Sequence, residues 1–307
     1  LLPVTDLDIP REPGVTVTDS HTKTSDGVLL RVIDFTPSGD TSTAPILLFV
    51  AGWISMISAW EDVLKVVTPR FRTLYLETRE KRSARIDWSG SPDFSIRRMT
   101  DDLDDVIQDR IPGNCPFCLA GSSLGSTVIL DYLGQKRRPP LLAIAIAPNA
   151  AFRIPSWFYT LARFIPPGAY GIVKEPIKWH LRKHRIDSTR EAEQVKKYER
   201  SLDWADPRRL KASALSMKGY SLWPKLPLIE APVLIVGAET DMLHGLDEME
   251  RMTALIPGAR LEVMASNRET HSEKAGQLIM NEIQSRQDRA QPCPAESYSL
   301  TSFDSFQ

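Results

Sequence analysis

The chain has 307 residues, a length that suits one large α/β domain with an insertion, or two domains. Its apolar content of 42% and its charged content of 25% are ordinary for a globular protein. A formal net charge of −1 gives no field that would recruit nucleic acid or an anionic membrane, and no run of residues approaches the roughly 18 apolar positions of a membrane-spanning helix.

The start of the chain carries no signal-peptide pattern. It reads Leu-Leu-Pro and lacks Met, and we expect a trimmed start or a fragment. We expect a soluble, cytoplasmic protein, and the alternative is an ectodomain separated from its anchor.

Strands are expected early in the chain. Residues 15–24 and 28–36 are β-rich, and the Ser-Asp-Gly turn between them is typical of a hairpin. Residues 46–51 are continuously apolar, which fits a strand buried on both faces of a parallel sheet. A helix is expected over residues 58–67, followed by a strand over residues 71–76.

A helix is expected over residues 95–111, and one side of it is strongly acidic. The aspartates on this side are Asp101, Asp102, Asp104 and Asp105. We expect them to be solvated rather than to bind a cation.

The three cysteines do not form the pattern of a disulfide framework. Cys115 and Cys118 have CxxC spacing, but no second CxxC is present to complete a zinc site. We expect both side chains to be buried or to lie at the edge of a strand.

The most informative stretch is Gly121-Ser-Ser-Leu-Gly125, which lies between an apolar run at residues 117–120 and a helical pattern at residues 127–133. Strand, Gly-x-Ser-x-Gly and helix together are typical of a nucleophile elbow. The tight turn needs small neighbours, and Gly121 and Gly125 provide them. Ser123 is therefore the predicted nucleophile; centring the pattern on the rival hydroxyl, Ser122, would require glycines where Ala and Leu stand.

The alternation of strand and helix continues to the end of the chain, with one helical interruption. The expected elements are strands at 141–147, 231–237 and 260–264, and helices at 246–255 and 271–286. We expect residues 1–150 and 227–288 to form the core, residues 151–226 a helical cap, and residues 289–307 a disordered tail.

Repeated βαβ units predict an α/β fold with a mostly parallel central sheet and helices on both faces. Ligands bind such sheets at the carboxyl ends of the strands. Ser123, Gly52-Trp53 and Asp241 all follow predicted strands, so we expect them at this edge, with the cap above them.

A serine nucleophile needs a base, and the base needs an orienting acid. Asp241 follows the strand at 231–237 and is the predicted acid, with Glu239 in reserve. His271 follows the next strand and is the predicted base. His244 is the rival base because it lies close to Asp241.

The remaining histidines fit a catalytic role less well. His21 lies in the hairpin, and His180 and His184 are one helical turn apart in the cap. Their spacing resembles a metal-binding pair, but no carboxylate completes the usual HExxH pattern, and solvated side chains are favoured. We expect neither a metal nor a cofactor.

A tetrahedral intermediate also needs hydrogen-bond donors for its oxyanion. One is the backbone N–H of Leu124, the residue after the nucleophile. We assign the second to the backbone N–H of Trp53, because the preceding Gly52 allows close approach.

These motifs resemble the α/β-hydrolase fold superfamily, specifically its capped, lipase- and esterase-like members. The resemblance covers roughly residues 13–286. It rests on the Ala51-Gly-Trp53 turn, the elbow, the loop at residues 237–241 that carries the predicted acid, and His271. The chain departs from the family pattern at Ala51, where many members have His. It also departs at residues 77–83, where a charged stretch replaces a glycine-rich turn.

The resemblance implies a serine esterase without a cofactor. The aromatic and basic cap favours a small apolar acyl or aryl ester as the substrate, and it also fits weak contact with a membrane surface. Thioester, lactone, C–C bond and aminopeptidase activities remain open, as does the oligomeric state. From another class, a non-catalytic protein that binds an apolar ligand or a partner is the second hypothesis, motivated by the departures at Ala51 and residues 77–83.

Overall fold

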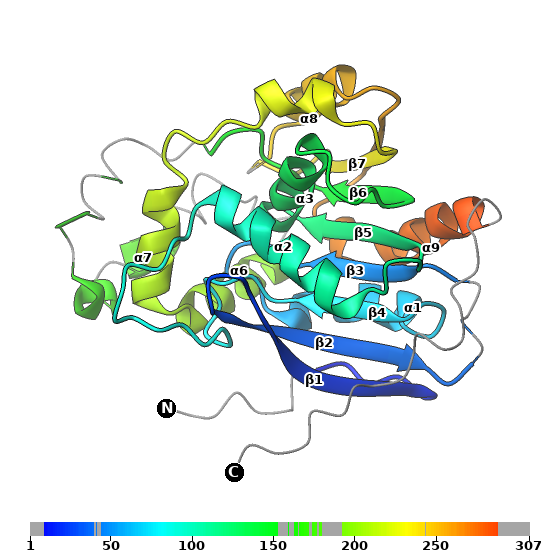
Figure 1. Cartoon of the computed structure of the whole chain (residues 1–307). Coiled ribbons are helices and arrows are strands. Elements are labelled where there is room, and N and C mark those ends of the chain that lie inside the picture. Colours follow the sequence, from blue (N-terminus) through cyan, green and yellow to red (C-terminus); the bar gives the residue numbers. More distant parts are fainter. Residues whose placement is uncertain are drawn as a thin grey trace, which may run out of the picture.

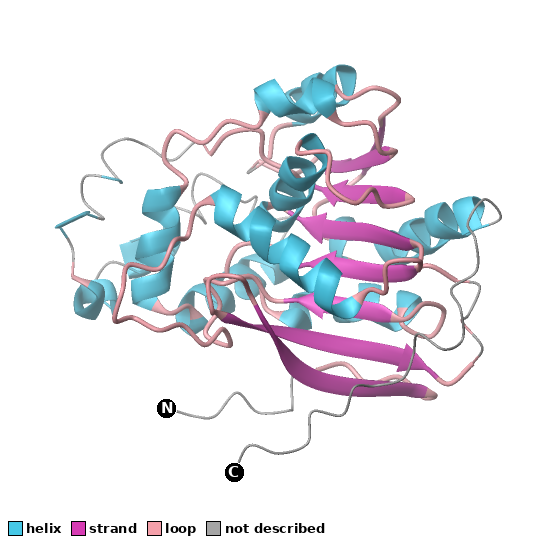
Figure 2. Cartoon of the chain, viewed as in Figure 1, coloured by secondary structure: helices cyan, strands magenta, loops and turns pink. Residues whose placement is uncertain are grey.

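The structure is a computed structural model, shown in Figures 1 and 2. It describes residues 9–39, 41, 44–152, 192–242 and 244–287, with short pieces between 159 and 179. These pieces are residues 159, 163–164, 166–171, 174–176 and 178–179. The predicted tail at 289–307 lies outside the described residues.

The core is one eight-stranded sheet with the order β1-β2-β4-β3-β5-β6-β7-β8. The strands are β1 (Val15–Lys23), β2 (Leu29–Pro37), β3 (Ile46–Val50), β4 (Thr73–Leu76), β5 (Phe117–Ser122), β6 (Leu142–Ile146), β7 (Val233–Ala238) and β8 (Arg260–Met264). β1 and β2 form an antiparallel hairpin, β2 pairs antiparallel with β4, and all other pairs are parallel. The mostly parallel sheet predicted from the apolar runs is confirmed.

Helices cover both faces of the sheet, as Figures 1 and 2 show. The α-helices are α1 (Glu61–Val67), α2 (Ile96–Arg110), α3 (Leu124–Gly134), α6 (Ala192–Trp204), α7 (Pro207–Ser216), α8 (Leu246–Leu255) and α9 (Glu273–Gln287). Short 3₁₀ turns are η2 (Ile57–Trp60), η3 (Pro167–Ala169), η4 (Trp223–Leu228) and η5 (Glu269–His271). α2 and α3 contact each other on one face, and α1 and α9 contact each other on the other.

Helix α3 is buried along its whole length, because the sheet lies below it and α2 and η4 contact it from the sides. Its apolar residues therefore surround the helix instead of forming one stripe. This burial fixes the start of α3, where the nucleophile elbow lies.

Between β6 and β7 the described elements are helical, in agreement with the predicted interruption of the strand–helix alternation. Figure 1 shows α6 and α7 beyond the carboxyl ends of the parallel strands. The boundaries of a cap at 151–226 stay a prediction, since residues 153–158 and 180–191 lie outside the described part. Among the described helices, none is long and apolar enough to cross a membrane.

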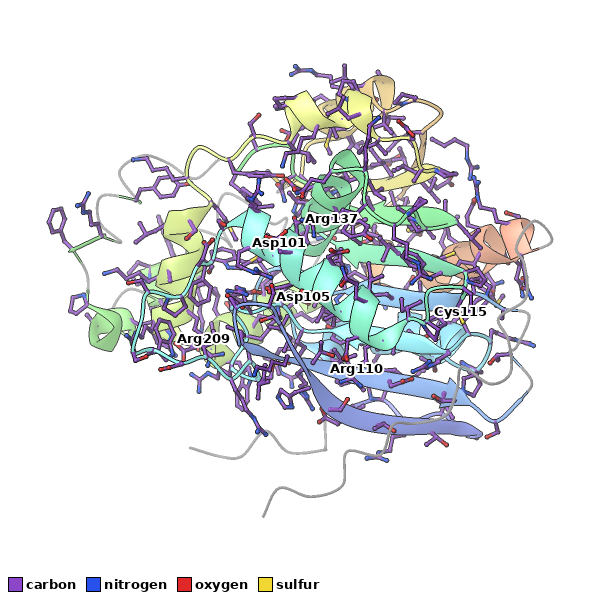
Figure 3. All side chains as sticks on the ribbon, in the orientation of Figure 1. Asp101, Asp105, Arg110, Cys115, Arg137 and Arg209 are labelled. Carbon is purple, nitrogen blue, oxygen red and sulfur yellow. The ribbon has the colours of Figure 1, made fainter. Side chains whose placement is uncertain are left out.

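The acidic side of α2 is not simply solvated, and this expectation is wrong. Asp102 is 3% exposed and receives two hydrogen bonds of 2.6 Å from the fully buried guanidinium of Arg79. Asp105 pairs with Arg98 at 2.8 Å, and Asp101 pairs with Arg137, which lies beside it in Figure 3. The aspartates attach α2 to its neighbours because their cationic partners come from other parts of the chain as well as from α2 itself.

Cys115 lies two residues before β5, and Cys118 lies within β5. Cys118 is free and fully buried, and burial raises the pKa of its thiol to about 12. Cys115 is buried and disulfide-bonded, on the opposite side of the molecule from Arg209 of α7 in Figure 3. The burial of both side chains was predicted, whereas the disulfide at Cys115 was not.

Candidate active site

The turn between β5 and α3 has the backbone strain of a nucleophile elbow. Ser123 adopts φ +46°, a left-handed conformation that L-residues rarely adopt. A Cβ atom at Gly125 would overlap the carbonyl oxygen of Val50, and one at Gly121 would lie 2.8 Å from the side chain of Ile129. The two glycines are therefore required by close packing, as the sequence pattern predicts.

A continuous chain of hydrogen bonds starts at Ser123. Its Oγ lies 3.0 Å from Nε2 of His244, and Nδ1 of His244 lies 2.9 Å from Oδ2 of Asp241. The backbone N–H of His244 also donates to Oδ1 of Asp241, at 3.0 Å. Both side chains are largely buried, with the imidazole 10% and the carboxylate 3% exposed. This is the geometry in which an imidazole can accept a proton from a serine hydroxyl.

The structure corrects the expected position of the base. His244, the rival candidate, lies against Ser123 and Asp241, and His271 does not take this place. His271 ends η5, where its Nδ1 lies 3.1 Å from the carbonyl oxygen of Asn267. Its ring packs against the buried Trp60, with centroids 4.3 Å apart and the ring planes tilted by 31°. These contacts direct the ring toward the packing between η5 and η2.

Burial also lowers the pKa of the His271 imidazole. Desolvation lowers the pKa of the imidazole from 6.5 to about 4, although the bond to Asn267 and the charge of Asp241 act in the opposite direction. His271 is therefore neutral near pH 7, as expected for a ring that packs against an aromatic side chain.

Asp241 and His244 share one loop, between β7 and α8. The sequence contained a signal for this pairing, because the two residues are only three positions apart and an Asp in a turn readily accepts the N–H of a following residue. Glu239, the reserve acid, is exposed, and its backbone N–H bonds to Met264 of β8.

The two predicted oxyanion donors lie beside the nucleophile. Leu124 is the first residue of α3, so its N–H has no carbonyl partner within the helix. Trp53 follows Gly52, where an added Cβ would lie 2.8 Å from Oγ of Ser122. The Gly52–Trp53 turn thus packs directly on the elbow, as the sequence indicated.

Asn149 was not singled out from the sequence. It lies just past the carboxyl end of β6, and its Nδ2 is 3.4 Å from Oγ of Ser123. Its backbone N–H donates to Oγ1 of Thr127 on α3, at 3.0 Å. The sequence offered one signal for Asn149. Pro148 ends a buried strand, so the residue after it is expected at the edge of the sheet where ligands bind.

Metal binding has no support in the described part of the chain, which contains no group of three His, Cys, Asp or Glu side chains that could hold an ion. The pair His180 and His184 lies outside the described residues.

Comparison with known proteins gives a family and a fold. A model described as the alpha/beta hydrolase family matches residues 47–280. Comparison with curated proteins gives no match.

Among solved structures, similar chains include an esterase from Thermogutta terrifontis, with 18% identity, a TM-score of 0.69, and coverage of 89% of this chain and 99% of that chain. An esterase from Exiguobacterium antarcticum has 17% identity and a TM-score of 0.67, over 87% of this chain and 100% of that one. An enol-lactonase from Burkholderia xenovorans LB400 has 15% identity and a TM-score of 0.69, over 86% and 99%. At these identities the similarity establishes the fold.

Proposed function

Because the chain belongs to the alpha/beta hydrolase family, we propose that it is a serine hydrolase that cleaves carboxylic esters. The observation that carries the proposal is the hydrogen-bonded series Ser123, His244 and Asp241 at the carboxyl edge of the sheet. The same three roles were expected from the sequence, but with His271 as the base.

The chemistry follows from the positions of the three side chains. Oγ of Ser123 attacks the ester carbonyl while Nε2 of His244 takes its proton. Asp241 accepts the Nδ1–H bond, fixes the tautomer, and stabilises the imidazolium that forms. His244 then gives the proton to the leaving alcohol, and a water molecule, activated by the same ring, hydrolyses the acyl-enzyme.

The negative charge of the tetrahedral intermediate falls on the former carbonyl oxygen. We assign its stabilisation to the backbone N–H groups of Leu124, which follows Ser123, and of Trp53, whose preceding residue Gly52 packs on the elbow. The position of Leu124 at the start of a buried helix adds a favourable electrostatic field for an anion.

An apolar acyl or aryl group is the proposed substrate class. The half-buried aromatic side chain of Trp53, on the turn that packs against the elbow, supports it. Phe164 and Trp179 of the cap region are 77% and 54% exposed, which supports weak contact with a membrane surface.

The test is covalent labelling followed by a substrate panel. We expect a fluorophosphonate probe to label the wild type and Ser122→Ala, and to fail with Ser123→Ala. Esters of p-nitrophenol with rising acyl length, together with a lactone and a thioester, then rank the substrate classes. A folded wild-type protein that is not labelled would favour a non-catalytic, ligand-binding protein and would refute the proposal.

A further inference from the structure

A buried ion pair lies beneath the turn that carries the proposed oxyanion donor Trp53. Glu80 and Lys81 follow β4, and the ammonium of Lys81 lies 2.7 Å from Oε1 of Glu80. Their side chains are 0% and 8% exposed. A charged stretch after a buried strand ordinarily lies in solvent, since burying charge costs free energy unless the charge is paired.

Both members of the pair hold the turn at residues 52–55. Nζ of Lys81 donates to the carbonyl oxygen of Gly52 at 2.5 Å, and Oε1 of Glu80 accepts the backbone N–H of Ile54 at 3.2 Å. The same carbonyl also accepts the N–H of Ser55, at 3.1 Å. Ile54 adopts φ +51°, which is strained for a β-branched residue and persists only when its surroundings enforce it.

The carbonyl of Gly52 and the N–H of Trp53 belong to one peptide group. A cation bound to the oxygen of a peptide withdraws electron density from its nitrogen, which makes the N–H a stronger hydrogen-bond donor. The ammonium of Lys81 thus polarises the proposed oxyanion donor through the carbonyl oxygen that it touches. Glu80 pairs with the same ammonium at 2.7 Å, so the field of the pair falls off beyond this peptide.

We propose that Lys81 is a positioning residue for catalysis, which fixes and polarises the Gly52–Trp53 peptide so that its N–H stabilises the oxyanion. The inference rests on the proposed serine hydrolase function. Lys81 itself touches neither substrate nor Ser123, and it acts through the peptide that it holds.

The helix α7 contacts both Lys81 and Trp53. Arg209, labelled on α7 in Figure 3, donates a hydrogen bond to the carbonyl oxygen of Lys81. The indole Nε1 of Trp53 donates to Oγ of Ser213, also on α7, at 3.0 Å. The position of Lys81 relative to the turn is therefore set by α7 as well as by β4.

The experiment compares three variants. Lys81→Met removes the ammonium but leaves the Glu80 carboxylate buried without its cation. This variant should therefore also have a lower free energy of unfolding. Glu80→Gln/Lys81→Met removes both charges, while the Gln side chain still offers an acceptor to the N–H of Ile54. Lys65→Met is the matched control, because Lys65 forms an exposed ion pair with Glu61 on α1.

A single oxyanion donor contributes about 10²- to 10³-fold to kcat, and polarisation strengthens a hydrogen bond by about 10–30%. We therefore expect kcat to fall by about two- to eightfold in the double variant, with KM within about twofold of the wild type. A trifluoromethyl ketone, which forms an oxyanion with the serine, should lose affinity by the same factor. The corresponding alcohol, which forms none, should bind unchanged.

The outcomes separate the two proposals. A wild type that fluorophosphonate does not label overturns both. A labelled wild type, together with a folded double variant whose kcat and ketone affinity are unchanged, overturns the role of Lys81 alone. Equal loss of affinity for ketone and alcohol would also overturn it, since it would indicate a general structural effect. Lys65→Met should change none of these values.

Discussion

Replacing His244 with glutamine should abolish ester cleavage, whereas the same replacement at His271 should preserve most of it. His244 is the ring whose Nε2 lies 3.0 Å from Oγ of Ser123. Glutamine has a similar size and can still bond to Asp241, but it cannot accept and return a proton near pH 7. The comparison therefore isolates proton transfer from packing.

The two replacements differ in their expected magnitude. Loss of the base from a serine triad lowers kcat by about 10⁴- to 10⁶-fold, or about 5–8 kcal/mol of transition-state stabilisation. At His271 the losses are the ring contact with Trp60 and the bond to Asn267, which contribute about 1–2 kcal/mol to the free energy of unfolding. We expect kcat of His271→Gln to stay within about threefold of the wild type.

The assay measures p-nitrophenyl ester hydrolysis and the rate of fluorophosphonate labelling, with urea unfolding of each variant as the control for folding. Labelling should be lost at His244→Gln and retained at His271→Gln. A folded His244→Gln protein that is labelled at the wild-type rate, with loss of labelling at His271→Gln, would refute the assignment of the base.

Asp241→Asn should lower kcat by about 10⁴-fold with little change in KM, because the amide cannot hold the required tautomer of His244; steady-state kinetics measures this. Gly125→Ala should lower the free energy of unfolding in urea by at least about 1–3 kcal/mol, because its Cβ overlaps the carbonyl oxygen of Val50. His271 has a folded-state pKa of about 4, below its ordinary value of 6.5, so the unfolded chain binds the proton first. Acidification from pH 6.5 to 4 should therefore cost up to about 3 kcal/mol, and His271→Gln should lose correspondingly less over the same range.

Much of the fold could be predicted because buried strands are distinctive in sequence. Continuous apolar runs predicted the inner parallel strands β3, β5, β6 and β7, and β-rich runs around a turn predicted the hairpin of β1 and β2, all to within a few residues; α8 (Leu246–Leu255) has the predicted bounds. Gly-x-Ser-x-Gly located Ser123 because the strain of the elbow admits so few residue types. Asp241 followed from its place after β7.

The base could not be chosen from chain order alone. His271 and His244 both follow strands that end at the same edge, and the choice depends on which way each ring turns in its loop. For His271 that direction is decided by Asn267 in the same loop and by Trp60, which belongs to a distant segment. Sequence spacing holds no information on such contacts.

The burial of charged residues was the other feature that could not be predicted from the sequence. Arg79, Glu80 and Lys81 belong to the charged stretch at residues 77–83, yet each is less than 9% exposed. Their burial depends on partners far along the chain, such as Asp102 for Arg79 and the carbonyl oxygen of Gly52 for Lys81. A charged residue with such a partner cannot be told from a solvated one by composition.

Asp241 and His244 lie in one loop, so the position of the acid and the base relative to Ser123 depends on that loop alone. In a site whose acid and base come from separate loops, either loop can move and break the series at a different bond. Here a displacement of the loop between β7 and α8 would move both side chains together and leave their bond of 2.9 Å intact. The distance that such a displacement would change is the 3.0 Å from Nε2 of His244 to Oγ of Ser123.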